Sequence, residues 1–211
     1  MHESERSQIT AVVLAGGQGS RMGGVDKGLT RLDGQPMVSH VLHRLAPQTG
    51  RLLINANRNR TAYAALGYPV LGDRLDGYQG PLAGIACALA QIETPLLLTA
   101  PCDTPLLPDD LALRLFRGMQ AGQAEIAVAF DGERVHPVCA LLRRELAPSL
   151  DEYLNGGGRK IDLWYAQHAT VGVDFSDRPD AFLNVNSPEE QAALEQRLQT
   201  GDPAPPKGAA R

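Results

Sequence analysis

Short apolar runs alternate with amphipathic segments along the first half of the chain. The pattern predicts strands over Ile9–Ala15, Arg51–Ala56, Pro69–Leu71 and Pro95–Ala100, and helices over Pro36–Leu45, Asn59–Leu66 and Pro81–Gln91. Strands that alternate with helices in this way usually form a parallel sheet with helices on both faces. We therefore expect an α/β fold built on a doubly wound, mostly parallel sheet.

The second half of the chain has a different pattern. Two apolar runs, Glu125–Phe130 and Arg134–Leu142, flank Asp131-Gly132, a dipeptide typical of tight hairpin turns. We expect this antiparallel hairpin to extend the sheet. One helix is predicted near Arg143–Leu154 and a last one after Ser187.

Length and composition favour a single domain over residues 1–200. A chain of 211 residues can bury one sizeable core without dividing. The last segment, 201–211, is rich in Pro, Ala and Gly and is expected to be a disordered tail. We find no internal repeat.

Charge and cysteine content exclude several classes of function. The net charge is −4 and no basic run is present, which argues against a nucleic-acid or membrane-surface partner. Cys87, Cys102 and Cys139 are odd in number and lack C-x-x-C spacing, so we expect reduced core thiols. Without a signal peptide or an apolar stretch of membrane length, the chain is expected to be soluble and cytoplasmic.

A glycine-rich loop follows the first predicted strand. It contains Gly16, Gly17 and Gly19, then Arg21 and, six residues later, Lys27. Glycines let the backbone approach a triphosphate closely, and the two cations can offset its charge. The spacing fits neither the G-x-x-x-x-G-K-[ST] phosphate loop nor the G-x-G-x-x-G dinucleotide loop. The alternative for a glycine-rich segment alone is a simple tight turn.

Polar residues also follow the later strands of the predicted sheet. Ligands of open parallel sheets bind outside the carboxyl ends of the strands, where Asn55, Asp73 and Asp103 stand. Asn and Asp also cap turns and helices, and this alternative applies to Asn55 and Asp73. Asp103 lies between two prolines, and its carboxylate is a natural ligand for Mg²⁺, which proteins often hold with one or two carboxylates plus substrate phosphates.

Taken together, these motifs resemble the molybdenum cofactor guanylyltransferases of the nucleotidyltransferase superfamily. The matching segments are Leu14–Lys27, Asn55–Asn57, Gly80–Gly84, Pro101–Pro105, Asp131-Gly132, His136-Pro137 and Asn184–Asn186. The early loop is shared with the whole superfamily, whereas the Pro-Cys-Asp-Thr-Pro loop and the late asparagines are more specific. The resemblance implies a Rossmann-like nucleotidyltransferase fold and the reaction of GTP with molybdopterin, giving molybdopterin guanine dinucleotide and pyrophosphate.

The resemblance also implies roles for individual residues. It assigns GTP binding to Leu14, Ala15, Gly16, Gly17, Lys27, Asn55, Asp73 and Asp103. Asp103 would in addition hold Mg²⁺. Arg21 and Lys27 would neutralise the triphosphate and, with Asp103, form the catalytic set.

The side of the site that would receive molybdopterin is less defined by the sequence. Arg159 and Lys160 follow three glycines and could reach the molybdopterin phosphate, or they could be solvated charges in a helix-joining loop. Asn184 and Asn186 alternate along a strand-like stretch, which would place both amides on one face, for a polar ligand or for structural hydrogen bonds. Recipient molybdoenzymes or their chaperones are further candidate partners.

Three other functions are compatible with parts of the pattern. Two are a cytidylyltransferase acting on the molybdenum cofactor and a sugar-phosphate nucleotidyltransferase, which tend to have alanine in place of Gly16 or a different Asp103 loop. The third is a protein that delivers the nucleotide cofactor without turnover. Lys27 and Asp103 argue against the third, since binding alone does not need a metal at the leaving group.

Overall fold

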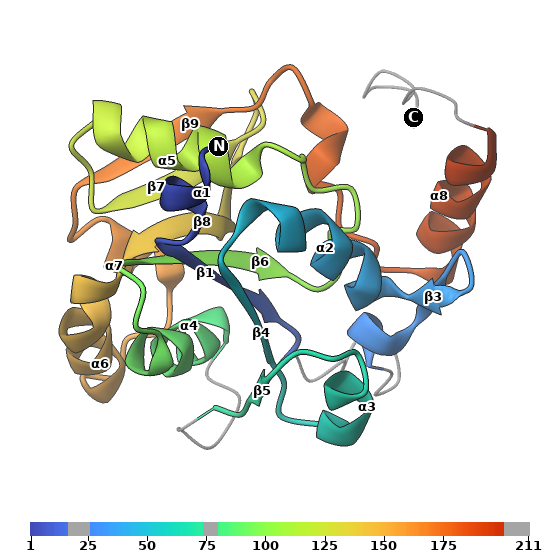
Figure 1. Cartoon of the computed structure of the whole chain (residues 1–211), viewed down its shortest axis with the longest axis horizontal. Coiled ribbons are helices and arrows are strands. Elements are labelled where there is room, and N and C mark those ends of the chain that lie inside the picture. Colours follow the sequence, from blue (N-terminus) through green and yellow to red (C-terminus); the bar gives the residue numbers. More distant parts are fainter. Residues whose placement is uncertain (17–25, 74–79, 201–211) are drawn as a thin grey trace.

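A seven-stranded sheet forms the centre of the molecule, in the order β5-β4-β1-β6-β8-β7-β9 (Figure 1). This computed structural model describes residues 1–16, 26–73 and 80–200. The strands are β1 (Ile9–Leu14), β4 (Arg51–Asn55), β5 (Val70–Leu71), β6 (Leu96–Pro101), β7 (Ile126–Phe130), β8 (Val135–Arg143) and β9 (Thr170–Asp174). A separate two-stranded sheet pairs β2 (Arg31–Leu32) with β3 (Gln35–Pro36).

The direction of the strands places most of their ends together. β1 pairs in parallel with β4 and β6, and β5 pairs in parallel with β4. β8 is antiparallel to both β6 and β7, and β9 is parallel to β7. Every strand of this sheet except β8 therefore ends at the same edge, which we call the carboxyl edge. The expected doubly wound sheet and the hairpin at Asp131-Gly132 are both confirmed.

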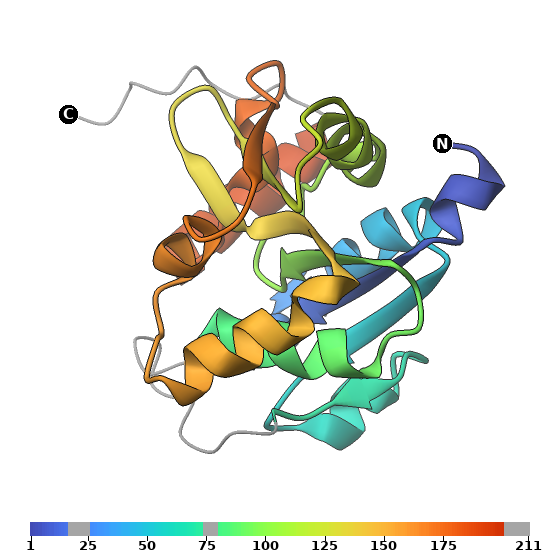
Figure 2. The ribbon, with the colours of Figure 1, turned by 90° about the vertical axis from the view of Figure 1, so that its left-hand side faces the viewer.

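Helices cover both faces of the sheet. They are α1 (Glu3–Arg6), α2 (Met37–Leu45), α3 (Arg60–Ala64), α4 (Pro81–Gln91), α5 (Leu111–Ala121), α6 (Ala147–Asn155), α7 (Ile161–Tyr165) and α8 (Pro188–Thr200). Short 3-10 turns are η2 (Lys27–Leu29), η3 (Ala46–Gln48), η4 (Arg144–Leu146) and η5 (Pro179–Phe182). α2 and α5 lie on one face, and α4 and α6 lie side by side on the other (Figures 1 and 2).

Alternating residues of β1 explain the two layers of core. Ala11 and Val13 are buried against α2 and α5, whereas Val12 is buried against α4 and α6. A strand that is covered on both faces is mostly apolar, and β1 has such a sequence, with the single buried hydroxyl of Thr10 hydrogen-bonded to Thr94. The three cysteines are buried thiols, as expected.

A third, smaller cluster attaches the last helix to the domain. Leu32, Met37, Val185 and Leu194 are buried together beneath α8. The Asp33 backbone N–H donates a hydrogen bond to Glu195 Oε1 at 3.0 Å. Figure 1 shows α8 next to β3, at the side of the molecule away from β7 and α6. No helix in the described part of the chain is both long enough and apolar enough to cross a membrane.

Several elements differ from the sequence prediction. α5, α7, β9 and the β2–β3 pair were not predicted. The stretch around Asn184 and Asn186 is not a strand, because its backbone follows η5 without joining a sheet. The expected tail, 201–211, lies outside the described residues, as do Gly17 and Arg21.

Candidate functional site

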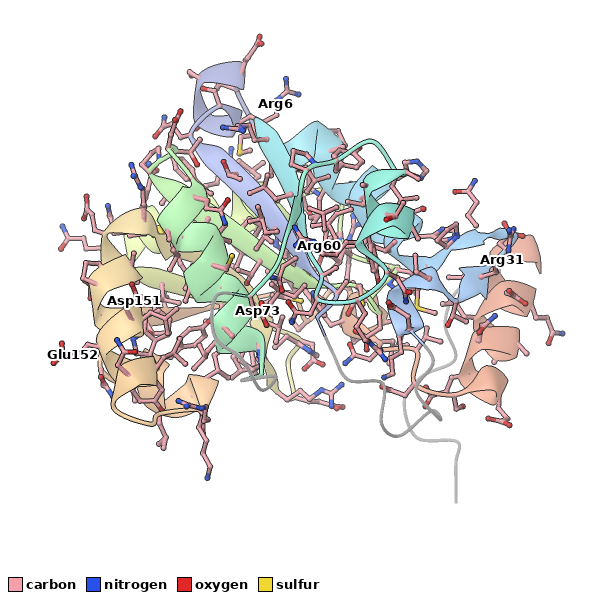
Figure 3. All side chains as sticks on the ribbon, turned by 90° about the horizontal axis from the view of Figure 1, so that it is seen from below. Arg6, Arg31, Arg60, Asp73, Asp151 and Glu152 are labelled. Atoms are coloured by element: carbon pink, nitrogen blue, oxygen red, sulfur yellow. The ribbon has the colours of Figure 1, made fainter. Side chains whose placement is uncertain are left out.

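At one end of the carboxyl edge, two asparagines bind an aspartate. Asn55, the last residue of β4, donates from Nδ2 to Asp73 Oδ1 at 2.8 Å. Asn57 donates to Asp73 Oδ2 at 2.6 Å, and the Asp73 backbone N–H donates to Asn57 Oδ1 at 2.8 Å. Figure 3 shows Asp73 beside the start of α4. The structure thus joins Asn55 and Asp73 to each other. We call Asn55, Asn57 and Asp73 the amide cluster.

Two glycines lie directly against the amide cluster. A Cβ added to Gly16 would lie 3.2 Å from both Asn55 Oδ1 and Asn57 Nδ2. A Cβ added to Gly84, in α4, would lie 2.4 Å from Asn55 Oδ1 and 2.9 Å from Leu14 Cδ2. Glycine is therefore required here for close approach. It leaves the Asn55 amide, which is 2% exposed, held between β1 and α4.

The chain that leaves β1 still bonds to β4 and to the residue after β6, on the two sides of β1. Ala15 donates its backbone N–H to the Asn55 carbonyl at 2.8 Å, and Leu14 accepts from the Cys102 N–H at 3.1 Å. These bonds extend the pairing of β1 with β4 and β6 by one residue on each side. Leu14, Ala15 and Gly16 thus lie between the amide cluster and the Asp103 loop, where the sequence places a nucleotide.

A second cluster gathers around Lys27. Its Nζ donates to Asn186 Oδ1 at 2.6 Å and lies 3.5 Å from Asp103 Oδ2. The Asp103 side chain is 16% exposed and that of Lys27 is 26% exposed. Burial raises the pKa of the Asp103 carboxyl, and the nearby Lys27 ammonium opposes this effect. We call Lys27, Asp103 and Asn186 the lysine cluster.

The segment around Asn184 and Asn186 is bound to the Asp103 loop. Val185 donates its backbone N–H to the Asp103 carbonyl at 2.9 Å. Thr104 Oγ1 donates to Asn184 Oδ1 at 2.9 Å. The predicted strand is wrong, but both asparagine side chains have partners at the carboxyl edge. Asn186 binds Lys27, and Asn184 binds the loop that carries Asp103.

Arg159 and Lys160 lie in the loop between α6 and α7, and not in the lysine cluster. Arg159 Nη1 donates to the carbonyls of Leu154, at 2.8 Å, and Gly158, at 2.5 Å, at the end of α6. The Lys160 carbonyl accepts a hydrogen bond from the Tyr153 hydroxyl at 2.9 Å. Because β8 ends opposite the carboxyl edge, α6 runs back toward that edge and brings this loop to the same side as the site.

His136, which lies in the matching segment His136-Pro137, makes contacts that support the fold. Its Nε2 lies 2.9 Å from Asp131 Oδ2, and its ring stacks on Phe182 with 4.6 Å between centroids. Asp131 Oδ1 also accepts from the backbone N–H groups of Glu133 and Arg134. These contacts stabilise the hairpin between β7 and β8.

Sequence reasoning missed Asn57 and Gly84 as parts of the site. The signal for Asn57 was its spacing of two from Asn55 at the end of a strand, which allows both amides to reach one partner. Gly84 lies in the matching segment Gly80–Gly84, but its contact with Asn55 could not be read from that segment, because it depends on how closely α4 approaches Asn55.

Comparison with known proteins places this geometry in a family. The family model described as "MobA-like NTP transferase domain" matches residues 11–171. That range holds most of β1, all of β4, β5 and β6, and both partners Asn55 and Asp73. The chain belongs to the MobA-like NTP transferase family.

Relatives and solved structures agree with this placement. A molybdenum cofactor guanylyltransferase from Shewanella loihica is 51% identical over 191 residues, covering 90% of this chain and 97% of the relative. A molybdopterin-guanine dinucleotide biosynthesis protein A from Archaeoglobus fulgidus has a TM-score of 0.75 at 20% identity, covering 90% and 99% of the two chains. A 4-diphosphocytidyl-2C-methyl-D-erythritol synthase from Anaerococcus prevotii has a TM-score of 0.73 at 9% identity, covering 94% and 100%. The two structural likenesses show the shared fold alone.

Nucleotidyltransferases of this family typically use a divalent metal. Asp103 is one described carboxylate at the carboxyl edge that could hold such an ion; it is partly buried and lies 3.5 Å from Lys27 Nζ. Within the described residues, no three His, Cys, Asp or Glu side chains gather to hold a metal. In the usual mode for Mg²⁺, a metal at Asp103 would take further ligands from phosphates and water.

Proposed function

We propose that this enzyme transfers GMP from GTP to molybdopterin, as its molybdenum cofactor, forming molybdopterin guanine dinucleotide and releasing pyrophosphate. The main support is that the amide cluster, at the ends of β4 and β5, and the lysine cluster, at the end of β6, lie on either side of the end of β1 on the same carboxyl edge. One suits a nucleoside and the other a triphosphate. The relative from Shewanella loihica, half identical over nearly its full length, is named for this transfer.

The chemistry requires little beyond positioning and charge neutralisation. The terminal phosphate oxygen of molybdopterin attacks the α-phosphorus of GTP, a new P–O bond forms, and the bond to pyrophosphate breaks. The attacking group is already an anion, so no general base is required. The Lys27 ammonium, together with Arg21 in our proposal, would lie against the triphosphate and offset the charge that develops on the leaving group.

Asp103 would hold Mg²⁺ at the triphosphate. When bound, the ion would supply Lewis-acid stabilisation of the phosphate oxygens. Lys27 already contacts Asp103 and Asn186, so its ammonium is positioned before any ligand enters.

The amide cluster would hold the nucleoside. A carboxylate has about four lone-pair positions, and the two asparagine amides use one on each oxygen of Asp73, so it can still accept donors from a ligand. Gly16 and Leu14–Ala15 would place the backbone against the purine. Gly17 belongs to the same predicted contact.

Molybdopterin would approach from the side of Asn184, Asn186, Arg159 and Lys160. Asn186 belongs to the lysine cluster and Asn184 binds the loop beside it, and the α6–α7 loop lies at the same edge of the sheet. Delivery of the product to recipient molybdoenzymes or their chaperones, and a cytoplasmic location, remain part of the proposal on the basis of the sequence.

Pyrophosphate release tests the proposed function. The purified chain is incubated with Mg²⁺, molybdopterin and either GTP or CTP, and pyrophosphate is measured with time. We expect release that depends on both GTP and molybdopterin. Equal turnover with CTP would contradict the guanylyl assignment, and binding of GTP without pyrophosphate release would favour a delivery protein.

Replacing Gly16 by alanine should reduce the preference for GTP. The new methyl group would press on Asn55 and Asn57 at 3.2 Å and occupy space that a purine needs more than a pyrimidine does. We expect the ratio of kcat/KM for GTP to that for CTP to fall about tenfold, the usual scale for one methyl group in a close-fitting pocket.

Gly172→Ala is the matched control for this substitution. Gly172 lies in β9, and a Cβ there has no neighbour within 4 Å in the described structure. We expect unchanged kinetics for this control. If Gly16→Ala lowered activity with both nucleotides equally, Gly16 would serve loop geometry and not base selection.

A further inference from the structure

Asp26, the residue before Lys27, is held by two side chains from α3 and its N-terminal cap, which belong to neither the amide cluster nor the lysine cluster. Asp26 Oδ1 accepts a hydrogen bond from the Tyr63 hydroxyl at 2.5 Å, and Oδ2 accepts one from Asn59 Nδ2 at 3.0 Å. Tyr63 lies in α3 and is fully buried, while Asn59 precedes that helix. α3 thus holds the end of the glycine-rich loop through both oxygens of one carboxylate.

The turn that carries Lys27 is shaped around the Tyr63 hydroxyl. A Cβ added to Gly28 would lie 2.4 Å from Tyr63 Oη and 3.3 Å from the ring atoms Cε1 and Cζ. Only glycine lets η2 approach this closely. Backbone bonds then connect Asp26 rigidly to the turn, since Leu29 donates to the Asp26 carbonyl at 3.0 Å and Thr30 donates to the Lys27 carbonyl at 3.2 Å.

Asn59 is used in an unusual way for its position. It is the residue at the N-terminal cap of α3, where an asparagine normally bonds a backbone N–H of its own helix. Here no side-chain cap bond forms, and its φ is 49°, in the left-handed region. Its amide reaches across to Asp26 instead. α3 therefore lacks a side-chain cap, and the Asn59 amide is used to hold Asp26.

Burial also keeps Tyr63 suited to this contact. It raises the pKa of the Tyr63 hydroxyl far above its usual value, with smaller contributions in the same direction from Cys102 and Asp26. The hydroxyl therefore stays protonated and donates to the Asp26 carboxylate. A neutral donor next to a carboxylate makes a short, strong hydrogen bond.

We propose that Tyr63 and Asn59 are positioning residues that fix Asp26 and, through the turn at Gly28, hold the Lys27 ammonium against Asp103 and Asn186. This inference rests on the proposed function, in which Lys27 acts on the triphosphate. Without the two hydrogen bonds to Asp26, the turn that carries Lys27 is no longer fixed to α3 by side-chain hydrogen bonds. Lys27 then spends less time in the position that the lysine cluster requires.

The first experiment removes the hydroxyl alone. Tyr63→Phe keeps the buried ring, and we expect kcat for pyrophosphate release to fall about tenfold, as a displaced catalytic group would cause. Tyr68→Phe is the matched control, since Tyr68 packs against the same core cluster, and its kinetics should not change. Activity of Tyr63→Phe within about twofold of the unaltered enzyme would overturn the proposal.

A double substitution separates positioning from general stability. In a Lys27→Ala background, Tyr63→Phe should lower kcat/KM by about twofold or less, because the group it positions is gone. If the two losses multiply instead, Tyr63 acts independently of Lys27 and the proposal is wrong. Asn59→Gly serves as a second variant if Tyr63→Phe folds poorly, because glycine accepts the left-handed φ but lacks the amide. We expect it to lower kcat about fivefold, a smaller loss than for Tyr63→Phe because the bond it removes is the longer of the two, 3.0 Å against 2.5 Å.

The contact at Gly28 can be tested without any substrate. Gly28→Ala should lower the melting temperature of the unaltered chain by more than it lowers that of Tyr63→Phe, since removing the hydroxyl relieves the 2.4 Å contact. Equal losses would show that the turn does not rest on Tyr63. This measurement stays valid if GTP and molybdopterin give no pyrophosphate, so failure of the anchor and failure of the proposed function are distinguishable.

Discussion

Replacing Asp103 by asparagine is expected to lower kcat about 100-fold or more, which corresponds to roughly 3 kcal/mol of lost transition-state stabilisation. The amide has the shape of the carboxylate but lacks its charge. It can accept a hydrogen bond from Lys27, yet it is a poor ligand for Mg²⁺. Steady-state pyrophosphate release at saturating GTP and molybdopterin measures the loss.

A neighbouring aspartate provides the control for this variant. Asp109 lies six residues further along the chain, is 66% exposed at its side chain and pairs with Arg44 at 2.7 Å. We expect Asp109→Asn to keep both kcat and melting temperature, because exposed ion pairs contribute little. Wild-type activity in Asp103→Asn, with an unchanged melting temperature in both variants, would remove the metal from our assignment of Asp103.

Lys27→Ala should have the second largest effect. The ammonium faces phosphates in both the bound and the transition state, so we expect a higher KM for GTP together with a slower transfer, about 50-fold in kcat/KM. The substitution also removes the bond to Asn186 at 2.6 Å. It therefore disturbs the segment proposed to receive molybdopterin.

Lys27→Arg tests whether charge alone is enough. Arginine keeps the positive charge but replaces a compact ammonium by a planar fork that cannot occupy the same position between Asp103 and Asn186. We expect it to recover part of the GTP affinity but little of kcat. If Lys27→Ala left both kinetic constants unchanged, Lys27 would be a solvated surface charge.

Local patterns predicted the parallel half of the sheet well. β1 and β6 are buried on both faces and so have apolar sequences interrupted only by one threonine each, and the helices between them have apolar faces. The Asp131-Gly132 turn predicted its hairpin because few other residues accept that backbone geometry. These signals act within a few residues of each other, and a single sequence contains them in full.

The elements that were missed have weaker local signals. β9 is an edge strand whose residues are all at least partly exposed, so its alternation of apolar and polar residues is shallow. α7 spans only Ile161–Tyr165, too short to show a helical period. α5 does show the apolar spacing of a buried face, with Leu111, Leu115 and Met119 buried, and could have been predicted.

The candidate site also has a part with local sequence signals and a part that depends on packing. The positions of Asn55, Asp73 and Asp103 at the carboxyl edge could be predicted because each one stands at or just after the end of a parallel strand. The contacts of Asp26 with Tyr63 and of Gly84 with Asn55 could not, since they depend on how closely separate elements approach. Distances between remote segments depend on how the segments pack together, and the sequence of one segment alone does not determine that packing.

The bond between Lys27 and Asn186 joins residues 159 positions apart and so has a consequence for synthesis on the ribosome. By the time Asp103 has been translated, every strand of the parallel half, β1, β4, β5 and β6, has been made. Lys27 then still lacks Asn186, which is made 83 residues after Asp103. A nascent chain that stops between these two residues can therefore contain the whole parallel half of the sheet without this partner of Lys27. Transfer activity should appear only after Asn186 has been made.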